Sequence, residues 1–138
     1  MINDFRFMNE RKKMTKSELE ERLIDFAVAI NKFAALLPKT FTGKHLSEQI
    51  IRSGTSPALN YGEAQSAESR KDFIHKIKII LKELRETLIS LKIISKSNLL
   101  SDQKLLSGLI TENNELISIF VKSVETATYN EKITTSKI

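Results

Sequence analysis

Hydrophobic positions recur every three or four residues along most of this chain, which is the spacing of one face of an α-helix. The first such segment covers residues 17–37, where Ser17 and Glu20 stand three apart as in a capping box. Pro38 then ends this helix, because proline removes a backbone donor and clashes with the preceding turn. Its apolar stripe consists of Leu19, Leu23, Phe26, Ala27, Ile30, Ala34 and Leu37. A second helix is predicted after Thr42, which serves as its N-cap.

The second helix is predicted to be interrupted within the stretch RSGTSPALNYGEA, residues 52–64. Glycine in mid-helix costs about 1 kcal/mol relative to alanine, and proline costs about 3 kcal/mol. A hydroxyl residue followed by proline is also a typical helix start, so the pattern predicts a stop and a restart. We expect Asn60 and Glu63 to hydrogen-bond to neighbouring helices and to hold this kink. The residues expected to shape the break are Gly54, Thr55, Ser56, Pro57, Asn60 and Glu63.

Two longer helices follow. Residues 69–97 carry an apolar stripe that includes Phe73 and Leu91, and residues 102–127 carry another, with Ser101 or Asp102 as the cap. Four striped helices with short connections predict an all-α fold. The expected architecture is an up-down-up-down four-helix bundle with helix two broken near Gly54–Pro57.

Length and composition fit one domain. The chain has 138 residues, and we assign residues 1–15 to a flexible N-terminal segment, 16–128 to the bundle and 129–138 to a polar tail. It contains no cysteine, which excludes disulfides and thiolate chemistry. Neither an apolar signal segment nor a run of about 18 apolar residues is present, so we expect a cytoplasmic protein that does not cross a membrane.

Catalytic and metal-binding patterns are weak. The chain has two histidines, and the hydroxyl residues near the predicted break form no nucleophile motif with them. His45 with Glu48 and Asp72 with His75 have a spacing seen in metal sites of helical bundles. Helical projection, however, turns Asp72 and His75 away from the core stripe. Glycine-rich phosphate motifs are also absent. The sequence therefore predicts no catalytic residue, no metal and no cofactor, hence no enzyme.

Positive charge is concentrated in one helix. The segment from Arg70 to Lys96 holds eight basic and three acidic residues, an excess equal to the chain's net charge of +5. Projected at about 100° per residue, six of the cations share one flank that is about 37 Å long. These are Lys71, Lys78, Lys82, Arg85, Lys92 and Lys96. Such a row suits the phosphates of a nucleic acid, while an ordinary solvated face is the alternative.

Three isoleucines on the same helix, Ile79, Ile89 and Ile93, also project away from the predicted core. Burying an exposed isoleucine is worth about 1.5–3 kcal/mol, so contact with a partner is favourable. These three residues are the predicted oligomer interface, although scattered exposed apolar residues are also normal on monomers.

The stretch from residue 52 to 94 resembles the bacterial four-helix-bundle family of proteins encoded in intervening sequences of 23S ribosomal RNA genes. The matching positions are Arg52, Ser53, Gly54, Thr55, Ser56, Asn60, Glu63, Ser69, Asp72, Phe73, Leu84, Glu86, Thr87 and Leu91. The first helix is similar too, through Lys16, Ser17, Phe26 and Ala27. The similarity covers about residues 16–97, and Pro57 departs from it where the family more often has an aliphatic residue.

The family is similar to the accessory protein of diversity-generating retroelements, a pentameric barrel of four-helix bundles that binds nucleic acid and a reverse transcriptase. The resemblance thus implies a non-enzymatic homo-oligomer, expected as a pentamer, with affinity for RNA or DNA. Our leading hypothesis is binding of phosphates by the six cations without reading of base sequence. The competing hypothesis is an adaptor that docks a partner enzyme such as a reverse transcriptase.

Overall fold

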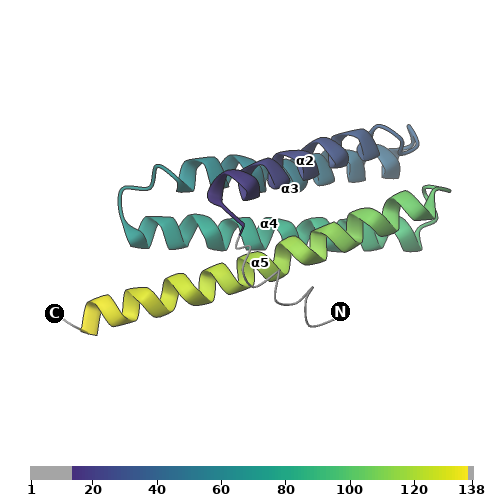
Figure 1. Cartoon of the computed structure of the whole chain (residues 1–138). Coiled ribbons are helices and arrows are strands. Elements are labelled where there is room, and N and C mark those ends of the chain that lie inside the picture. Colours follow the sequence, from purple (N-terminus) through teal and green to yellow (C-terminus); the bar gives the residue numbers. More distant parts are fainter. Residues whose placement is uncertain (1–13, 137–138) are drawn as a thin grey trace, which may run out of the picture.

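The computed structural model describes residues 14–136 and confirms an all-α, four-helix fold. The helices are α2 (Lys16–Ala34), α3 (Phe41–Ala64), α4 (Arg70–Lys96) and α5 (Gln103–Ser136). Successive helices run in opposite directions (Figure 1). α2 packs against α3 and α5, and α4 also packs against α3 and α5, so the four helices form a closed ring. The flexible segment predicted for residues 1–15 lies almost entirely outside the described residues.

Each helix begins at a residue whose side chain caps its first turn. Thr15 and Thr40 accept hydrogen bonds from the backbone N–H of Glu18 and of Gly43, both at 3.1 Å. Ser69 accepts one from Asp72 in the same way at the start of α4, and Asp102 Oδ1 accepts one from Leu105 at 3.0 Å at the start of α5. Of the two caps considered for the fourth helix, Ser101 and Asp102, the structure has Asp102, whereas Ser69, predicted as the first residue of the third helix, is its N-cap.

The caps predicted at Ser17 and Thr42 are wrong by two residues, because an earlier threonine is available in each case. Thr15 and Thr40 have extended backbone conformations, with ψ of 163° and 170°, which place the hydroxyl oxygen over the first turn. The capping-box spacing of Ser17 and Glu20 therefore does not mark the start of α2, since Ser17 is already inside the helix.

The predicted break in the second helix is wrong. α3 continues from Phe41 to Ala64 with Pro57 buried inside it, and Thr55 and Ser56 cap no restarted helix. Gly54 serves close packing instead: a Cβ at this position would lie 2.7 Å from Cγ2 of Ile30 on α2. Proline inside a helix has an intrinsic cost of about 3 kcal/mol. In a folded protein, however, the stability of a helix comes mainly from the packing of its buried face.

Side chains around Pro57 bond mostly within α3. Thr55 Oγ1 donates to the carbonyl of Ile51 at 2.7 Å, and Asn60 Nδ2 donates to the carbonyl of Ser56 at 3.0 Å. The predicted bond from Asn60 to a neighbouring helix is therefore wrong. Glu63 does reach another helix, because it accepts a 2.6 Å hydrogen bond from Lys76 of α4.

The fourth helix is longer than the sequence pattern predicts. We expected it to end near residue 127 and to be followed by a polar tail, yet α5 extends to Ser136. The segment from 128 to 136 contains neither glycine nor proline, so nothing in it stops a helix that is already formed. Figure 1 shows this C-terminal end reaching beyond the other three helices.

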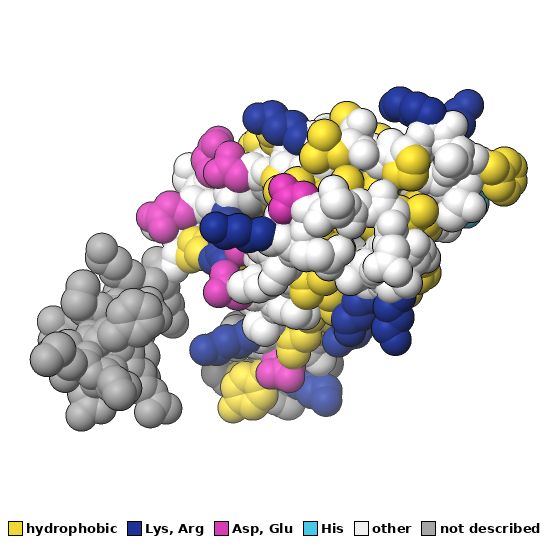
Figure 2. Space-filling view, turned by 90° about the vertical axis from the view of Figure 1, so that its right-hand side faces the viewer, with side chains coloured by type: hydrophobic (Ala, Val, Ile, Leu, Met, Phe, Trp, Pro, Cys, Tyr) yellow, Lys and Arg dark blue, Asp and Glu magenta, His cyan; other side chains and the backbone are white. Residues whose placement is uncertain are grey.

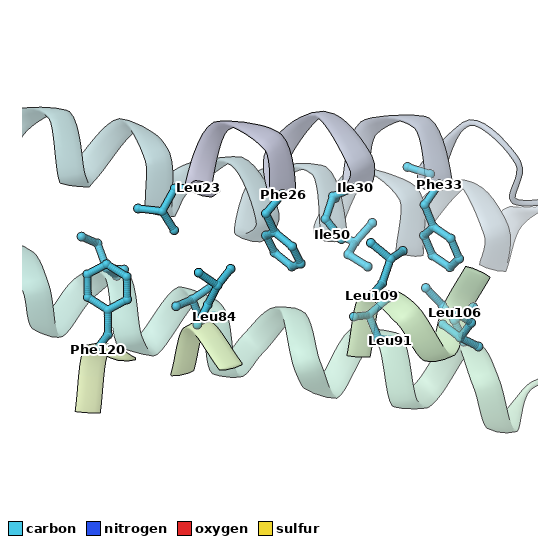
Figure 3. Packing of buried hydrophobic residues seen from close by; sticks show 14 of the residues in the cluster. Leu23, Phe26, Ile30, Phe33, Ile50, Leu84, Leu91, Leu106, Leu109 and Phe120 are labelled. Atoms are coloured by element: carbon cyan, nitrogen blue, oxygen red, sulfur yellow. The ribbon is translucent and has the colours of Figure 1, made fainter. Parts of the chain in front are cut away.

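The core lies along the bundle axis and is built from the predicted stripes (Figure 3). Phe26 of α2, Leu84 of α4 and Phe120 of α5 are at most 2% exposed. The rings of Tyr61 and Phe120 meet edge to face, with centroids 5.9 Å apart. On α4 the buried face is turned relative to the prediction, since Thr87 is buried and Phe73 is only half-buried.

The core also contains buried polar residues. Thr87 Oγ1 donates to Ser53 Oγ at 2.9 Å, and both residues are buried. Asn113 is fully buried, and its amide has no hydrogen-bond partner among residues 14–136. An unpaired buried amide costs about 1–3 kcal/mol, so Asn113 is a less favourable core residue than an apolar side chain of similar size.

Within residues 14–136, no helix has the length and apolar content needed to cross a membrane.

Candidate nucleic-acid interface

All six cations predicted to bind phosphate lie on the outer face of α4, and all six are exposed. They are Lys71, Lys78, Lys82, Arg85, Lys92 and Lys96. None of them forms an ion pair within the described part of the chain, where the paired cations are Arg22, Arg52 and Lys76. The charge of the six is therefore available to a partner outside the chain.

The outer face of α4 is hollowed. A depression of about 860 Å³, which we call the α4 hollow, is lined by residues of α3, α4 and, at one edge, Val124 of α5. Three of the six cations, Lys78, Lys82 and Arg85, form part of its wall. Lys71, Lys92 and Lys96 lie outside this lining but on the same helix. The structure thus gathers half of the predicted row around one concavity.

Arg52 of α3 pairs with two acidic residues beside this hollow and offsets one of their two negative charges. Its Nη1 lies 3.1 Å from Oε2 of Glu83, and its Nη2 lies 2.8 Å from Oε2 of Glu86. The hydrogen bond to Glu86 and the charge of Glu83 raise the pKa of Arg52, while the bond from Arg52 lowers the pKa of Glu86. With both carboxylates engaged, the free cations dominate the local field.

Arg52→Gln is expected to destabilise the fold by about 1–2 kcal/mol, because Glu83 is only 9% exposed and would lose its cationic partner. Urea denaturation at pH 7 measures this loss. Since Arg52 holds the pKa of Glu86 below its usual value, the Arg52–Glu86 part of the effect is present at neutral pH and disappears on acidification through that pKa.

The matched control for this prediction is Arg85→Gln, which removes an exposed arginine that has no ion pair within residues 14–136. We expect its effect on stability to stay within about 0.5 kcal/mol. Adding Glu83→Gln to the Arg52→Gln variant should restore part of the lost stability. A double variant no more stable than the single one would contradict this account of Arg52.

Charged pairs elsewhere join the helices to one another. Arg22 Nε donates to Glu112 Oε2 at 2.9 Å, and Arg22 also pairs with Glu115, which ties α2 to α5. The hydrogen bond to Glu112 raises the pKa of Arg22. In Figure 2 the acidic side chains lie mainly toward the left, with Lys and Arg side chains among them, while other Lys and Arg side chains on the right have no acidic neighbours in this view.

The isoleucines predicted as an oligomer interface do not behave alike. Ile89 and Ile93 are 55% and 46% exposed, whereas Ile79 is half-buried. Ile89 and Ile93 line the α4 hollow together with Lys82 and Arg85, and Ile79 does not. The two predicted surfaces therefore overlap at Ile89 and Ile93.

Sequence reasoning missed Arg52 and Gln49 as parts of this site. Both are on α3, and Arg52 meets acidic residues that lie 31 and 34 positions further along the chain. No local spacing links such distant residues, so the signal is available only after the helices are placed. Two histidines considered earlier remain uninvolved: His45 and His75 are exposed, and no group of three His, Cys, Asp or Glu in the described region is arranged to hold a metal.

The fold and this face define an antiparallel four-helix bundle with a basic, hollowed outer surface on one helix. The chain belongs to the family of 23S rRNA-intervening sequence proteins, whose family model matches residues 15–122. A protein with unknown function from the S23 ribosomal protein family of Bacteroides thetaiotaomicron has a similar crystal structure, with 30% identity and a TM-score of 0.69. That match covers 76% of this chain and 96% of the other. A search of curated proteins gave no match.

Proposed function

We propose that this chain is a non-enzymatic bundle that binds nucleic acid, RNA above all, through the outer face of α4. The observation that carries the proposal is the group of six exposed cations on one helix, none of them paired within residues 14–136. Cations of this kind bind phosphates and release condensed counterions, which favours association without base recognition.

The surroundings of the α4 hollow support this proposal. Two acidic residues, Glu83 and Glu86, lie close to the cations and would repel phosphates if they were free. Arg52 pairs with both, and the carboxylate of Glu83 is almost fully covered. Lys78, Lys82 and Arg85 then face solvent with little opposing charge, over a concave surface that admits a flexible strand.

We also propose that the protein is a homo-oligomer, with the pentamer as the expected form from the resemblance to the retroelement accessory protein. Exposed apolar side chains away from the α4 hollow support self-association. Val28 of α2 is 45% exposed, and Leu59 of α3 is 68% exposed. Contact between copies through α2 and α3 would cover such side chains and leave the cations of α4 accessible.

The direct test is a salt titration of RNA binding by the wild-type protein. Fluorescence anisotropy with a labelled oligonucleotide should give an affinity that falls steeply between about 50 and 300 mM KCl. Each phosphate of a single strand contributes about −0.7 to the log–log slope, so six contacts give at most about −4. Affinity that is absent or insensitive to salt would overturn the proposal. Stoichiometric recovery of one protein partner after nuclease treatment would then favour an adaptor.

A further inference from the structure

The α4 hollow combines positive charge with exposed hydrocarbon. Ile89 and Ile93 stand one turn apart on its surface, and roughly half of each side chain faces solvent. Cations stand on both sides of this pair along the helix. Arg85 precedes Ile89 by about one turn, and Lys96 follows Ile93 by nearly one turn. One face of α4 therefore presents two exposed apolar side chains with a cation about one turn away at either end of the pair.

A ligand that offers only phosphates cannot cover the apolar side chains of Ile89 and Ile93. A duplex presents its sugar–phosphate backbone outward and keeps the faces of its bases stacked inside, so it leaves Ile89 and Ile93 facing water. A single strand has unstacked bases whose apolar faces can cover hydrocarbon while the backbone stays on the cations. The chemistry of the hollow therefore matches a strand with accessible bases.

We propose that the α4 hollow is a site for single-stranded nucleic acid, in which bases lie against Ile89 and Ile93 and the flanking phosphates contact Lys82, Arg85, Lys92 and Lys96. This inference rests on the proposed function and narrows the proposed ligand from nucleic acid in general to single strands. The spacing supports it, because Arg85 and Lys92 are two turns, or about 10.5 Å, apart along the helix axis. Ile89 lies between them.

A second copy of the chain is a poorer occupant of the same hollow. Packing apolar side chains onto Ile89 and Ile93 would also bury the neighbouring cations Lys82 and Arg85, which form no ion pair within residues 14–136. Removing unpaired cations from water is unfavourable unless the partner supplies negative charge. Nucleic acid supplies that charge in every nucleotide.

The first measurement compares ligands with the wild-type protein. Anisotropy titrations with a 20-nucleotide single-stranded RNA and with its duplex form, at one salt concentration, should show the single strand bound about tenfold more tightly. Equal affinity for both, with a steep salt dependence, would overturn the inference and leave the proposed function standing. Binding of neither RNA would remove the proposed function itself.

The second measurement uses the double variant Ile89→Ser, Ile93→Ser. Its affinity for the single strand should fall about tenfold, while its affinity for the duplex and the salt slope stay unchanged, because no phosphate contact is lost. Leu105→Ser is the matched control: Leu105 is also an exposed apolar residue, but it lies on α5, outside the hollow and outside the proposed contact through α2 and α3. We expect Leu105→Ser to leave the affinity unchanged.

Two further outcomes of that experiment would count against the inference. Unaltered single-strand affinity in the double variant would show that the isoleucines contact no base. Sedimentation that changes from an oligomer to a monomer, with equal losses for single strand and duplex, would assign Ile89 and Ile93 to a subunit contact. Far-UV circular dichroism and thermal melting verify that the variant is folded, which we expect because both side chains are partly exposed already.

Discussion

The triple variant Lys78→Glu, Lys82→Glu, Arg85→Glu is expected to bind single-stranded RNA about a hundredfold more weakly than the wild-type protein at about 100 mM salt. These three residues line the α4 hollow, and none is paired within residues 14–136. Losing three phosphate contacts should make the log–log salt slope less steep by about 2. The introduced carboxylates would also repel the backbone. Anisotropy titrations at several salt concentrations measure both effects.

The control for this variant is a second triple reversal with the same change in net charge: Lys39→Glu, Lys44→Glu, Lys104→Glu. These lysines are exposed, none lies on α4 and none lines the α4 hollow. Because the phosphate contacts of the hollow remain in this variant and distant surface charges are screened by salt, we expect a loss of less than about threefold. Equal losses in both triple variants would mean that overall charge, and not the α4 hollow, determines affinity.

Gly43→Ala is expected to be the most destabilising alanine substitution among the glycines. A Cβ at position 43 would overlap the carbonyl oxygen of Pro38, and it would lie 3.0 Å from the carbonyl carbon. The obstacle is backbone, so the α2–α3 connection or the first turn of α3 has to move. We expect a loss of about 3 kcal/mol in the free energy of unfolding, at the upper end of the range for overpacking, measured by urea denaturation.

The other glycines of α3 are graded controls for that prediction. Gly54→Ala meets the buried side chain of Ile30, whose branched carbon is stiff, and should cost about 1–3 kcal/mol. Gly62→Ala meets nothing within 4 Å and should stabilise the helix by about 0.5–1 kcal/mol. A neutral Gly43→Ala, or a Gly62→Ala variant as unstable as Gly54→Ala, would contradict the packing described for α3.

Helical periodicity was sufficient to predict the four elements and their buried faces, except on α4, where the buried face is turned toward Thr87. Leu23, Ile30 and Leu84 are fully buried, as their stripes predicted, because an amphipathic helix can bury only the face on which its apolar residues recur. The same projection placed the six cations of α4 on an exposed face. Local composition was enough for these features, since each depends on residues within one helix.

Local composition failed where the partner lies on another helix. From helix propensity alone, Gly54 and Pro57 are predicted to break the helix. In the structure Gly54 lies against Ile30, and Pro57 is buried inside a continuous α3. The energy that keeps this helix intact comes from packing between helices, which no propensity scale contains. The end of α5 was predicted too early in the chain. Polar residues do not end a helix when no helix-breaking residue stands among them.

By itself, the sequence determined the fold class, most of the buried stripes and the face of α4 that carries the charge. Only the tertiary structure brought Arg52 to Glu83 and Glu86, buried Asn113 in the core, and joined Ile89 and Ile93 to the cations in one hollow. Periodicity reports the direction of a side chain within its own helix. The neighbour that it meets depends on how the helices are placed against one another, and the chemistry of a surface depends on those neighbours.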